Sequence, residues 1–437
     1  MLKLPNSWAA VKLGDFVENE KGKKPKNESK TKTASHNLPY VDIQAFEENV
    51  IHTWTDGVGC RLCYETDFLM VWDGSRSGLV GKGMNGALGS TLVRIYFPSM
   101  VNDYAFYFLQ SKYQQINTRA KGVGIPHVDP ALLWNYDFPI PPLNEQHRIV
   151  AKIEELFSEL DKGIENLKTA RAQLKVYRQA LLKHAFEGKL TSASSDGVWV
   201  EKTLGNLLDF LTSGSRGWAQ YYAAAGDLFI RAQNIKHDRL DLNDIAFVSI
   251  PERAEGLRTR VKKGDLLITI TGANVTKSAL VERDVGTAYV SQHVALCRPT
   301  TEVFPRFLYW FIVAEAAGRK QLSDMAYGAG KPGLNLENIR SVLVPFPGLP
   351  EQEKIVELIE GKLSEVDQLD LTITNALQQA EALRQSILKK AYAGQLVPQD
   401  PHDEPASVLL ARIKAERADV TAKPRKKPSS KRAHVSN

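Results

Sequence analysis

The sequence predicts an α/β (α+β) protein with two globular domains in tandem, separated by long helices that form an antiparallel coiled coil. Three observations support this fold class. The chain of 437 residues contains an internal duplication with an offset of 206, the second part of each copy has a heptad pattern, and the first part has short β-branched and aromatic runs. An apolar content of 43% is ordinary for a protein with buried cores.

The duplication is clearest in the second part of each copy. Residues 139–190 align without a gap to residues 345–396, and 21 of the 52 paired positions are identical. The identical pairs include Glu145 with Glu351 and Gln146 with Gln352. Upstream the match becomes weaker and needs small gaps. Each copy therefore combines a variable module with a well-preserved helical module.

Apolar residues recur every 3.5 positions along both helical modules, which is typical of a coiled coil. We call these positions the heptad stripe: Ile149, Ile153, Leu156, Leu160, Gly163, Leu167, Ala170, Leu174, Tyr177 and Leu181 in the first copy, and Ile355, Ile359, Lys362, Val366, Leu369, Ile373, Ala376, Ala380, Leu383 and Ile387 in the second. Each helix should follow a proline-rich segment and stop near a glycine, Gly188 or Gly394. A helix of about 40 residues spans on the order of 60 Å. Two such helices in one chain favour intramolecular antiparallel pairing over a coiled coil that only dimerises the protein.

The variable modules have a mixed pattern. Strands are expected at 92–97, 266–270 and 290–298, and helices at 104–113 and 306–317. The resulting domain map has globular domains at 1–138 and 196–344, helical spacers at 139–195 and 345–396, and a tail at 397–437 with a short helix and a basic end. Residues 423–432 are rich in proline, serine and lysine and are expected to be disordered.

Charge, cysteine content and hydropathy limit the classes of protein. The net charge is +6, but the segment from residue 412 onward carries +7, so the remaining 411 residues sum to about −1 and any DNA-binding surface there must be a local patch. Three cysteines, Cys60, Cys63 and Cys297, suit a reducing compartment. The Cys60–Cys63 pair has no further ligands at zinc-site spacing, so a structural pair is favoured. No apolar run approaches the roughly 18 residues of a membrane span, which predicts a cytoplasmic protein without a membrane partner.

Four loop regions in each module carry side chains that contact DNA in many proteins, because arginine and lysine pair with guanine and phosphate, and asparagine and glutamine with adenine. In the first module the candidates are Lys23, Lys24, Lys26, Gln44, Ser75, Arg76, Lys82, Lys121 and His127. In the second they are Arg216, Gln233, Asn234, Lys236, Asn274, Lys277, Lys331 and Asn335. Polar loops are usually only solvated. However, these four loops recur at matching places in both modules while their sequences diverge. This is expected of two domains that recognise different DNA sequences.

Motifs of catalysis are missing from the sequence. It contains no GxxxxGK[ST] phosphate loop, no GxGxxG after a strand, no HExxH, no GxSxG, and no Asn/Asp-Pro-Pro-Tyr/Phe motif. Two Glu-x-Lys triplets, at Glu187 and Glu360, fall in the helical modules, where a charged helix face is the simpler interpretation. We therefore expect no catalytic residue and no metal site, and we assign any chemistry to a partner.

Three duplicated motifs resemble the specificity subunit of Type I restriction-modification enzymes. They are Pro-x-Pro-x-Leu-x-Glu-Gln at 139–146 and 345–352, Arg-Gln-x-x-Leu-Lys-x-Ala at 178–185 and 384–391, and the Gly-x-Leu stops after them. The tail helix at 406–418 adds to the likeness, which covers essentially the whole chain. The resemblance implies two target recognition domains, each reading one half of a bipartite, asymmetric site in double-stranded DNA, with helices that set the gap between the halves.

The resemblance also implies partners in phage defence. These are two methyltransferase (modification) subunits that use S-adenosylmethionine to methylate adenine N6, and motor-nuclease (restriction) subunits that use ATP and Mg²⁺. The cofactors sit on those partners, and the resemblance transfers no base-contacting residue. Three alternatives stay open: a specificity subunit of a methylation-only or other anti-phage system, an enzyme with an unrecognised motif, and a coiled-coil scaffold without a DNA role.

Overall fold

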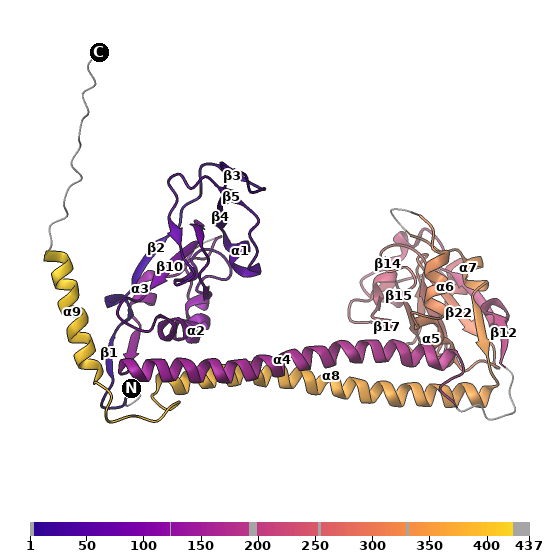
Figure 1. Ribbon diagram of the computed structural model, residues 1–437. Coiled ribbons are helices and arrows are strands. Elements are labelled where there is room, and N and C mark those ends of the chain that lie inside the picture. The colour runs from indigo at the N-terminus through magenta and orange to yellow at the C-terminus, as the bar shows by residue number, and fades with distance from the viewer. Residues whose placement is uncertain (1–3, 123, 192–198, 252–254, 329–331, 423–437) are drawn as a thin grey trace, which may run out of the picture. The chain divides into compact units, whose positions relative to one another are not determined.

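The computed structural model of the chain describes residues 4–122, 124–191, 199–251, 255–328 and 332–422 (Figure 1). The chain divides into two compact units. Unit 1 combines residues 1–165 with residues 377–437, and unit 2 is the continuous stretch 166–376. The basic segment 423–432, predicted to be disordered, lies outside the described residues.

The globular module of unit 1 is built on two larger sheets. An antiparallel sheet has the order β2 (Glu18–Lys21), β10 (Leu92–Tyr96), β7 (Phe68–Val71), β8 (Val80–Lys82). A second sheet has the order β3 (Glu28–Ser29), β5 (Trp54–Thr55), β4 (Leu38–Val41), β9 (Gly86–Leu88), β6 (Leu62–Cys63). In the second sheet β4 and β9 run parallel, and its other pairs are antiparallel.

The remaining elements of this module connect it to the long helix. Strand β1 (Ala9–Lys12) pairs with β11 (Asp137–Ile140), which leads into that helix. The described part of the module also contains the α-helices α1 (Ile43–Glu48), α2 (Asn102–Thr118) and α3 (Pro130–Trp134). Strand β7 is buried along its whole length, and α2 packs Tyr104 and Phe108 into a core with Phe68, Phe97 and Phe138. Apolar burial of this kind is the main stabilising term for such a module.

Unit 2 repeats this plan. An antiparallel sheet has the order β13 (Leu208–Ser213), β22 (Val294–Pro299), β19 (Leu266–Thr269), β20 (Ser278–Leu280), and a second sheet has the order β14 (Tyr222–Ala223), β18 (Ala246–Val248), β15 (Asp227–Ile230), β21 (Ala288–Val290). The parallel pair is now β15 and β21. The other elements are β12 (Val200–Thr203) paired with β23 (Leu343–Phe346), the hairpin β16 (Ile235–Lys236) and β17 (Arg239–Leu240), and the helices α5 (Pro305–Val313), α6 (Gly318–Met325) and α7 (Leu336–Arg340).

Two segments differ from the sequence prediction. The strand expected at 290–298 is two strands, β21 and β22, because the polar residues Ser291, Gln292 and His293 form a turn between them. The helix expected at 306–317 ends earlier, at Val313, and a separate helix, α6, begins only at Gly318. The strands at 92–97 and 266–270 and the helix at 104–113 correspond to β10, β19 and α2.

The two long helices, α4 (Leu143–Phe186) and α8 (Leu349–Tyr392), have 44 residues each and confirm the predicted pair (Figure 1). They end just before Gly188 and Gly394, each with φ of +70°, the left-handed conformation that glycine favours after a helix. Antiparallel packing is visible within each unit from ion pairs: Arg384 with Asp161 in unit 1, and Arg171 with Asp370 at 2.8 Å in unit 2. None of the described helices is long and apolar enough to cross a membrane.

Burial along the helices agrees with the heptad stripe at many positions, including Val366, Ile373 and Ala380 in the middle of α8, but not at all of them. Ile153 and Ile359 are buried, but Tyr177, Leu369 and Leu383 are 45%, 52% and 52% exposed. Those three positions were wrongly placed in the contact. A helix has 3.6 residues per turn, so a strict seven-residue repeat drifts by about 20° per heptad unless the helices supercoil.

The identical glutamine at the start of each helix has a structural explanation. The side-chain oxygen of Gln146 accepts from the backbone N–H of Val101 at 3.0 Å, and its amide donates to the Pro141 carbonyl at 3.0 Å. Gln352 makes the same two bonds, to Phe304 N–H at 2.8 Å and to the Pro347 carbonyl at 2.9 Å. Each buried glutamine therefore fixes its long helix to the globular module.

The second helix completes the core of unit 1. Ile387, Leu388 and Ala391 of α8 pack there with Ile153 and Phe157 of α4. The tail helix α9 (Ala406–Ala422), predicted at 406–418, adds Ala406, Leu409 and Ile413 to the same core.

The two glycine stops also have equivalent neighbours. Gly394 lies against Pro5 and Trp8, and Gly188 lies against Trp199. The C-terminal end of each long helix thus packs against the tryptophan near the start of a globular module.

Candidate nucleic-acid interface

The parallel strand pair of each module defines where the candidate loops gather. In unit 1, β4 and β9 end at Val41 and Leu88 on the same edge of the sheet. In unit 2, β15 and β21 end at Ile230 and Val290 in the same way. The carboxyl ends of parallel strands are the usual ligand-binding edge of such sheets, because the backbone there turns into loops that face the same direction.

In unit 1 the four candidate loops meet at this edge. Lys21, at the start of the first loop, pairs with Asp73 of the third loop at 2.7 Å. Arg76 of the third loop pairs with Glu47 of α1 at 2.9 Å, close to Gln44 of the second loop. The backbone N–H of Gly74 donates to the Pro126 carbonyl of the fourth loop at 2.8 Å. The loops therefore form one surface.

Unit 2 shows the corresponding contacts. Gly272 N–H donates to the Pro332 carbonyl at 3.1 Å, and the Asn274 side chain donates to the Ala232 carbonyl at 3.4 Å. Gly214 N–H donates to the Ser291 carbonyl at 3.2 Å, which joins the first loop to the turn after β21. The second module thus holds its loops in the same backbone arrangement, which we call the loop frame, but with different side chains.

Several candidate cations on this surface are exposed and lack an ion pair to any described residue. They are Lys23, Lys24 and Lys26 in unit 1 and Arg216 in unit 2. Lys277 of unit 2 is half-buried and likewise has no ion pair to a described residue. Such cations are available to phosphate groups. In unit 1, Lys121 pairs with Asp129 at 2.7 Å and the exposed His127 lies beside it, joined to Lys121 by backbone hydrogen bonds.

Other candidates are already engaged. Lys236 pairs with Asp241 at 2.8 Å, and this hydrogen bond raises the pKa of the lysine. Gln44 donates to Glu48 at 3.0 Å. Exposed ion pairs contribute little to stability, so DNA phosphates can replace such partners at small cost. Ser75 and Gln233 are exposed.

Three candidates have structural roles or lie elsewhere. Asn234 is 2% exposed, and its amide donates to the carbonyls of Asp241 and Asp244 at 3.1 and 2.9 Å. Asn335 caps α7 by accepting from Asn338 N–H at 2.7 Å. Lys82 pairs with Phe68 in the β7–β8 ladder, at the end of that hairpin away from the loop surface. Lys331 lies outside the described residues.

The turn after the second parallel strand was missed by the sequence analysis. It comprises Gly89, Ser90 and Thr91 in unit 1 and Ser291, Gln292 and His293 in unit 2. In unit 2 these residues line a cavity of about 340 Å³ with Ser215, Arg231 and Gln233, and Trp218 stacks on Phe229 in its wall with ring centroids 4.7 Å apart. The signal in the sequence was the polar Ser-Gln-His interruption of an otherwise apolar run.

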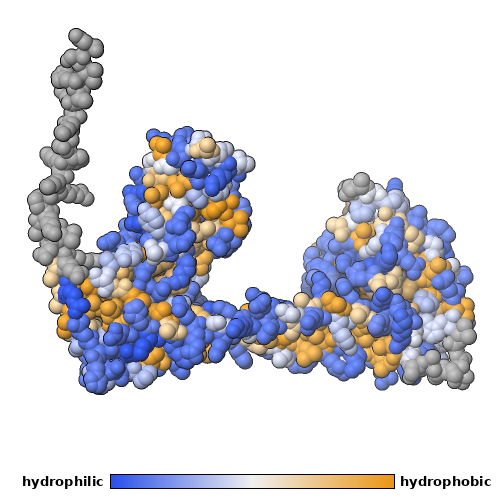
Figure 2. Space-filling model, viewed as in Figure 1, coloured by the Kyte–Doolittle hydropathy of each residue, from blue (hydrophilic) through white to orange (hydrophobic). Residues whose placement is uncertain are grey.

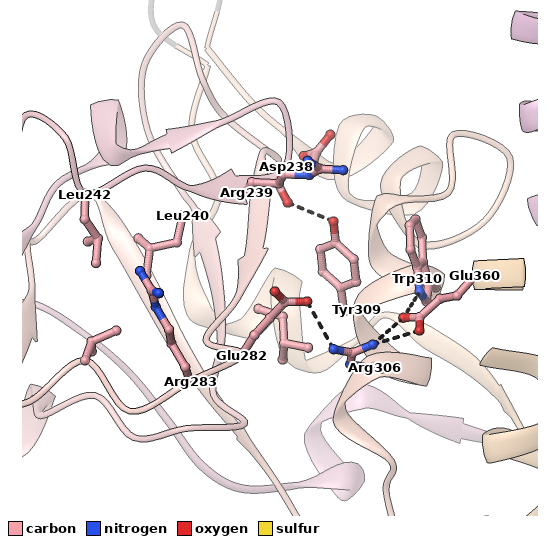
Figure 3. A pocket seen from close by; sticks show the side chains of 12 residues that line it. Asp238, Arg239, Leu240, Leu242, Glu282, Arg283, Arg306, Tyr309, Trp310 and Glu360 are labelled. Atoms are coloured by element: carbon pink, nitrogen blue, oxygen red, sulfur yellow. Dashed lines mark hydrogen bonds and ion pairs between the residues drawn. The ribbon is translucent and has the colours of Figure 1, made fainter. Parts of the chain in front are cut away.

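A larger cavity of about 530 Å³ lies elsewhere in unit 2, between the globular module and α8 (Figure 3). Arg306 pairs with Glu360 of α8 at 2.7 Å, and the Trp310 indole donates to the same carboxylate at 3.2 Å. The Tyr309 hydroxyl donates to the Asp238 carbonyl at 2.8 Å on the opposite wall (Figure 3). These contacts fasten the module to its helix, and none of the candidate loop residues lines this cavity.

Cys63 is in β6 of the second sheet of unit 1, and Cys60 lies just before that strand. Cys63 is buried, its thiol donates to the Gly86 carbonyl at 3.5 Å, and burial raises its pKa to about 12. Cys60 is partly exposed. Among the described residues, no group of three or more His, Cys, Asp or Glu side chains is arranged to hold a metal ion.

Comparison with known proteins identifies the family. The family model described as Type I restriction modification DNA specificity domain matches residues 5–169 and 199–381. The chain belongs to this family. Its members recognise a DNA sequence for a restriction-modification enzyme, and catalysis lies with partner subunits.

Relatives and solved structures agree with this assignment. The chain is 24% identical over 409 residues to the Type I restriction enzyme MjaVIII specificity subunit of Methanocaldococcus jannaschii, covering 90% of this chain and 94% of the relative. It is 26% identical over 449 residues to the EcoBI specificity subunit of Escherichia coli, covering 96% and 94%. The fold is similar to that of the HsdS subunit of Thermoanaerobacter tengcongensis, with a TM-score of 0.57, 20% identity, and 90% and 98% of the two chains covered. A chain from a type I restriction-modification complex gives a TM-score of 0.70 at 20% identity, with 90% and 100% covered.

Proposed function

We propose that this chain reads a bipartite, asymmetric site in double-stranded DNA. Domain 1–138 reads one half and domain 196–344 reads the other, while the helical spacers 139–195 and 345–396 set the unread gap between them. The observation that carries this proposal is the repeated loop frame, which holds different side chains in its two copies. One frame with two sets of side chains suits recognition of two different half-sites.

The proposed DNA contacts fall into two groups. Lysine and arginine side chains contact phosphates, whereas glutamine, asparagine, serine and histidine side chains face base edges. The first group is Lys23, Lys24, Lys26, Arg76, Lys121, Arg216, Lys236 and Lys277, and the second is Gln44, Ser75, His127, Gln233 and Asn274. Lys82, Asn234 and Asn335 are left out because of their positions and structural roles.

Two modification subunits are the proposed helix-docking partners. Tyr177 and Leu383 are equivalent by the offset of 206, and both are exposed, at 45% and 52%. Apolar side chains lie among hydrophilic ones on the exposed helix surface (Figure 2). Equivalent apolar positions on two helices suit two copies of one partner. S-adenosylmethionine would be used by those subunits, and ATP and Mg²⁺ by motor-nuclease subunits.

Genome-wide mapping of methylated adenines tests the reading function. Cells that carry the complete system should show one motif with two specified halves and an unread gap, and deletion of the gene for this chain should abolish it. Methylation that persists in the deletion strain, or a motif without a gap, would contradict the proposal.

Native mass spectrometry of the purified complex tests the docking positions. Tyr177→Asp and Leu383→Asp should each reduce the number of bound methyltransferase subunits from two to one, because a buried unpaired carboxylate is costly. The control is Gln173→Ala at an exposed position of α4. Two bound subunits in both aspartate variants would exclude these positions from the contact.

A further inference from the structure

The turn that follows the second parallel strand has the same backbone structure in both units. In unit 1, Gly89 N–H donates to the Val41 carbonyl at 2.8 Å, Leu92 N–H to Gly89 at 3.0 Å, and Trp72 N–H to Thr91 at 2.8 Å. These three bonds close the turn from both sides. They also tie it to β4 and to the start of the third loop.

Unit 2 makes the same three bonds at equivalent positions. Ser291 N–H donates to the Ile230 carbonyl at 2.8 Å, Val294 N–H to Ser291 at 3.0 Å, and Ile270 N–H to His293 at 2.9 Å. The backbone of the turn is therefore fixed independently of its side chains.

The side chains on this common frame differ. Unit 1 places Ser90 and Thr91 there, both half-buried, whereas unit 2 places the half-buried Gln292 and the exposed His293. Gln292 and His293 lie 3.1 Å apart between their Nε2 atoms, and His293 Nδ1 hydrogen-bonds to Thr271 of the third loop. Gln233 of the second loop lines the same cavity.

A glycine holds the first loop directly against this turn in each unit. A Cβ atom at Gly22 would lie 2.1 Å from the Gly89 carbonyl oxygen, and one at Gly214 would lie 2.2 Å from that of Val290. Both distances are impossible for a real Cβ, so only glycine permits this approach. The loop that carries Lys23 in unit 1, and the loop that carries Arg216 in unit 2, are therefore anchored beside the turn.

We infer that this turn determines sequence specificity, with Gln292 and His293 reading base edges in one half-site and Ser90 and Thr91 reading them in the other. Glutamine can bond both N6 and N7 of adenine, a histidine N–H can donate to a purine acceptor, and serine or threonine can bond a base edge singly. Phosphate contacts from the neighbouring cations set the register, and the turn supplies the sequence information. The inference rests on the proposed function and names the residues that carry it out.

The test is methylation mapping with the complete system carrying Gln292→Ala, His293→Ala, or the double exchange Gln292→Ser with His293→Thr. Each variant should relax or change one or two base positions in one half-site, with discrimination falling roughly 5- to 100-fold at those positions. The other half-site and the gap should stay unchanged. Ser90→Ala with Thr91→Ala should affect only the opposite half. The matched control, Lys263→Ala, changes an exposed residue near the start of β19, at the end away from Thr271.

If a variant loses methylation altogether, the affinity of the purified variant complex is measured for DNA duplexes substituted at each base of the site. This measurement keeps the test decisive. Loss of affinity that depends on the base at one or two positions supports the inference. An unchanged motif, or an equal loss for every duplex in an assembled complex, overturns it. A wild-type system that yields no bipartite motif would instead refute the proposed function, so the two failures are distinguishable.

Discussion

Lengthening both long helices by one heptad should widen the gap between the two half-sites. Seven residues add about 10 Å to a helix, and a base pair of B-DNA rises about 3.4 Å, so the gap should grow by about three base pairs if the extension is fully transmitted. A whole heptad is chosen because it preserves the helix contact better than other lengths.

The ion pairs show where to insert the residues. We place the insertions after Leu167 in α4 and after Ile373 in α8. The ion pair of Arg171 with Asp370 then lies on one side of the inserted heptads, and the ion pair of Arg384 with Asp161 lies on the other side. Both contacts are thus kept, and the two helices lengthen at nearly the same level.

Methylation mapping is the assay, with the wild-type system as reference. The two half-site sequences should persist while the gap lengthens. A second heptad of different surface sequence should give the same gap, and a heptad in α4 alone should disrupt assembly. An unchanged gap in a folded, active complex would refute the reasoning and mean that partner subunits position the two domains.

Two further predictions concern stability and thiol chemistry. Gln352→Ala should lower the free energy of unfolding of unit 2 by about 1–3 kcal/mol for each backbone group that it leaves both buried and unpaired, measured by denaturant unfolding. The groups that lose this partner are the Phe304 N–H and the carbonyls of Pro347 and Glu302. The exposed Gln368→Ala should change the free energy little, and equal effects would contradict the anchoring role. Iodoacetamide at pH 8 should label Cys60 in the native protein and should label Cys63 and Cys297 only after unfolding, because burial raises the pKa of the Cys63 and Cys297 thiols. Mass spectrometry is the measurement, and labelling of Cys63 or Cys297 in the native protein would disprove their burial.

The helical part of the fold was predictable because it depends on local patterns. Proline before the helix, apolar residues at helical spacing, and Gly188 or Gly394 after it are sufficient to locate α4 and α8. The exact contact stripe was less predictable. It depends on how the two helices wind around each other, and a one-dimensional repeat does not contain that information.

The loop surface was predictable in its location but not in its composition. The sequence shows which loops are polar and repeated, yet it does not show that Asn234 is buried or that Asn335 is a helix cap. Gln292 and His293 were missed because they interrupt what reads as a single strand, and the turn is defined by bonds to Ile230 and Ile270, which are distant in sequence.

Unit 1 is built from two separate segments of the chain, and this affects the order in which the units fold during synthesis. Unit 2 is one continuous stretch, 166–376, so it can fold as soon as that stretch has left the ribosome. Unit 1 must wait for residues after 376, because Ile387, Leu388 and Ala391 complete its core. The part of the chain made first is thus the last to become stable, and until then Ile153 and Phe157 lack their apolar partners on α8 and leave part of that core open to aggregation or to chaperones.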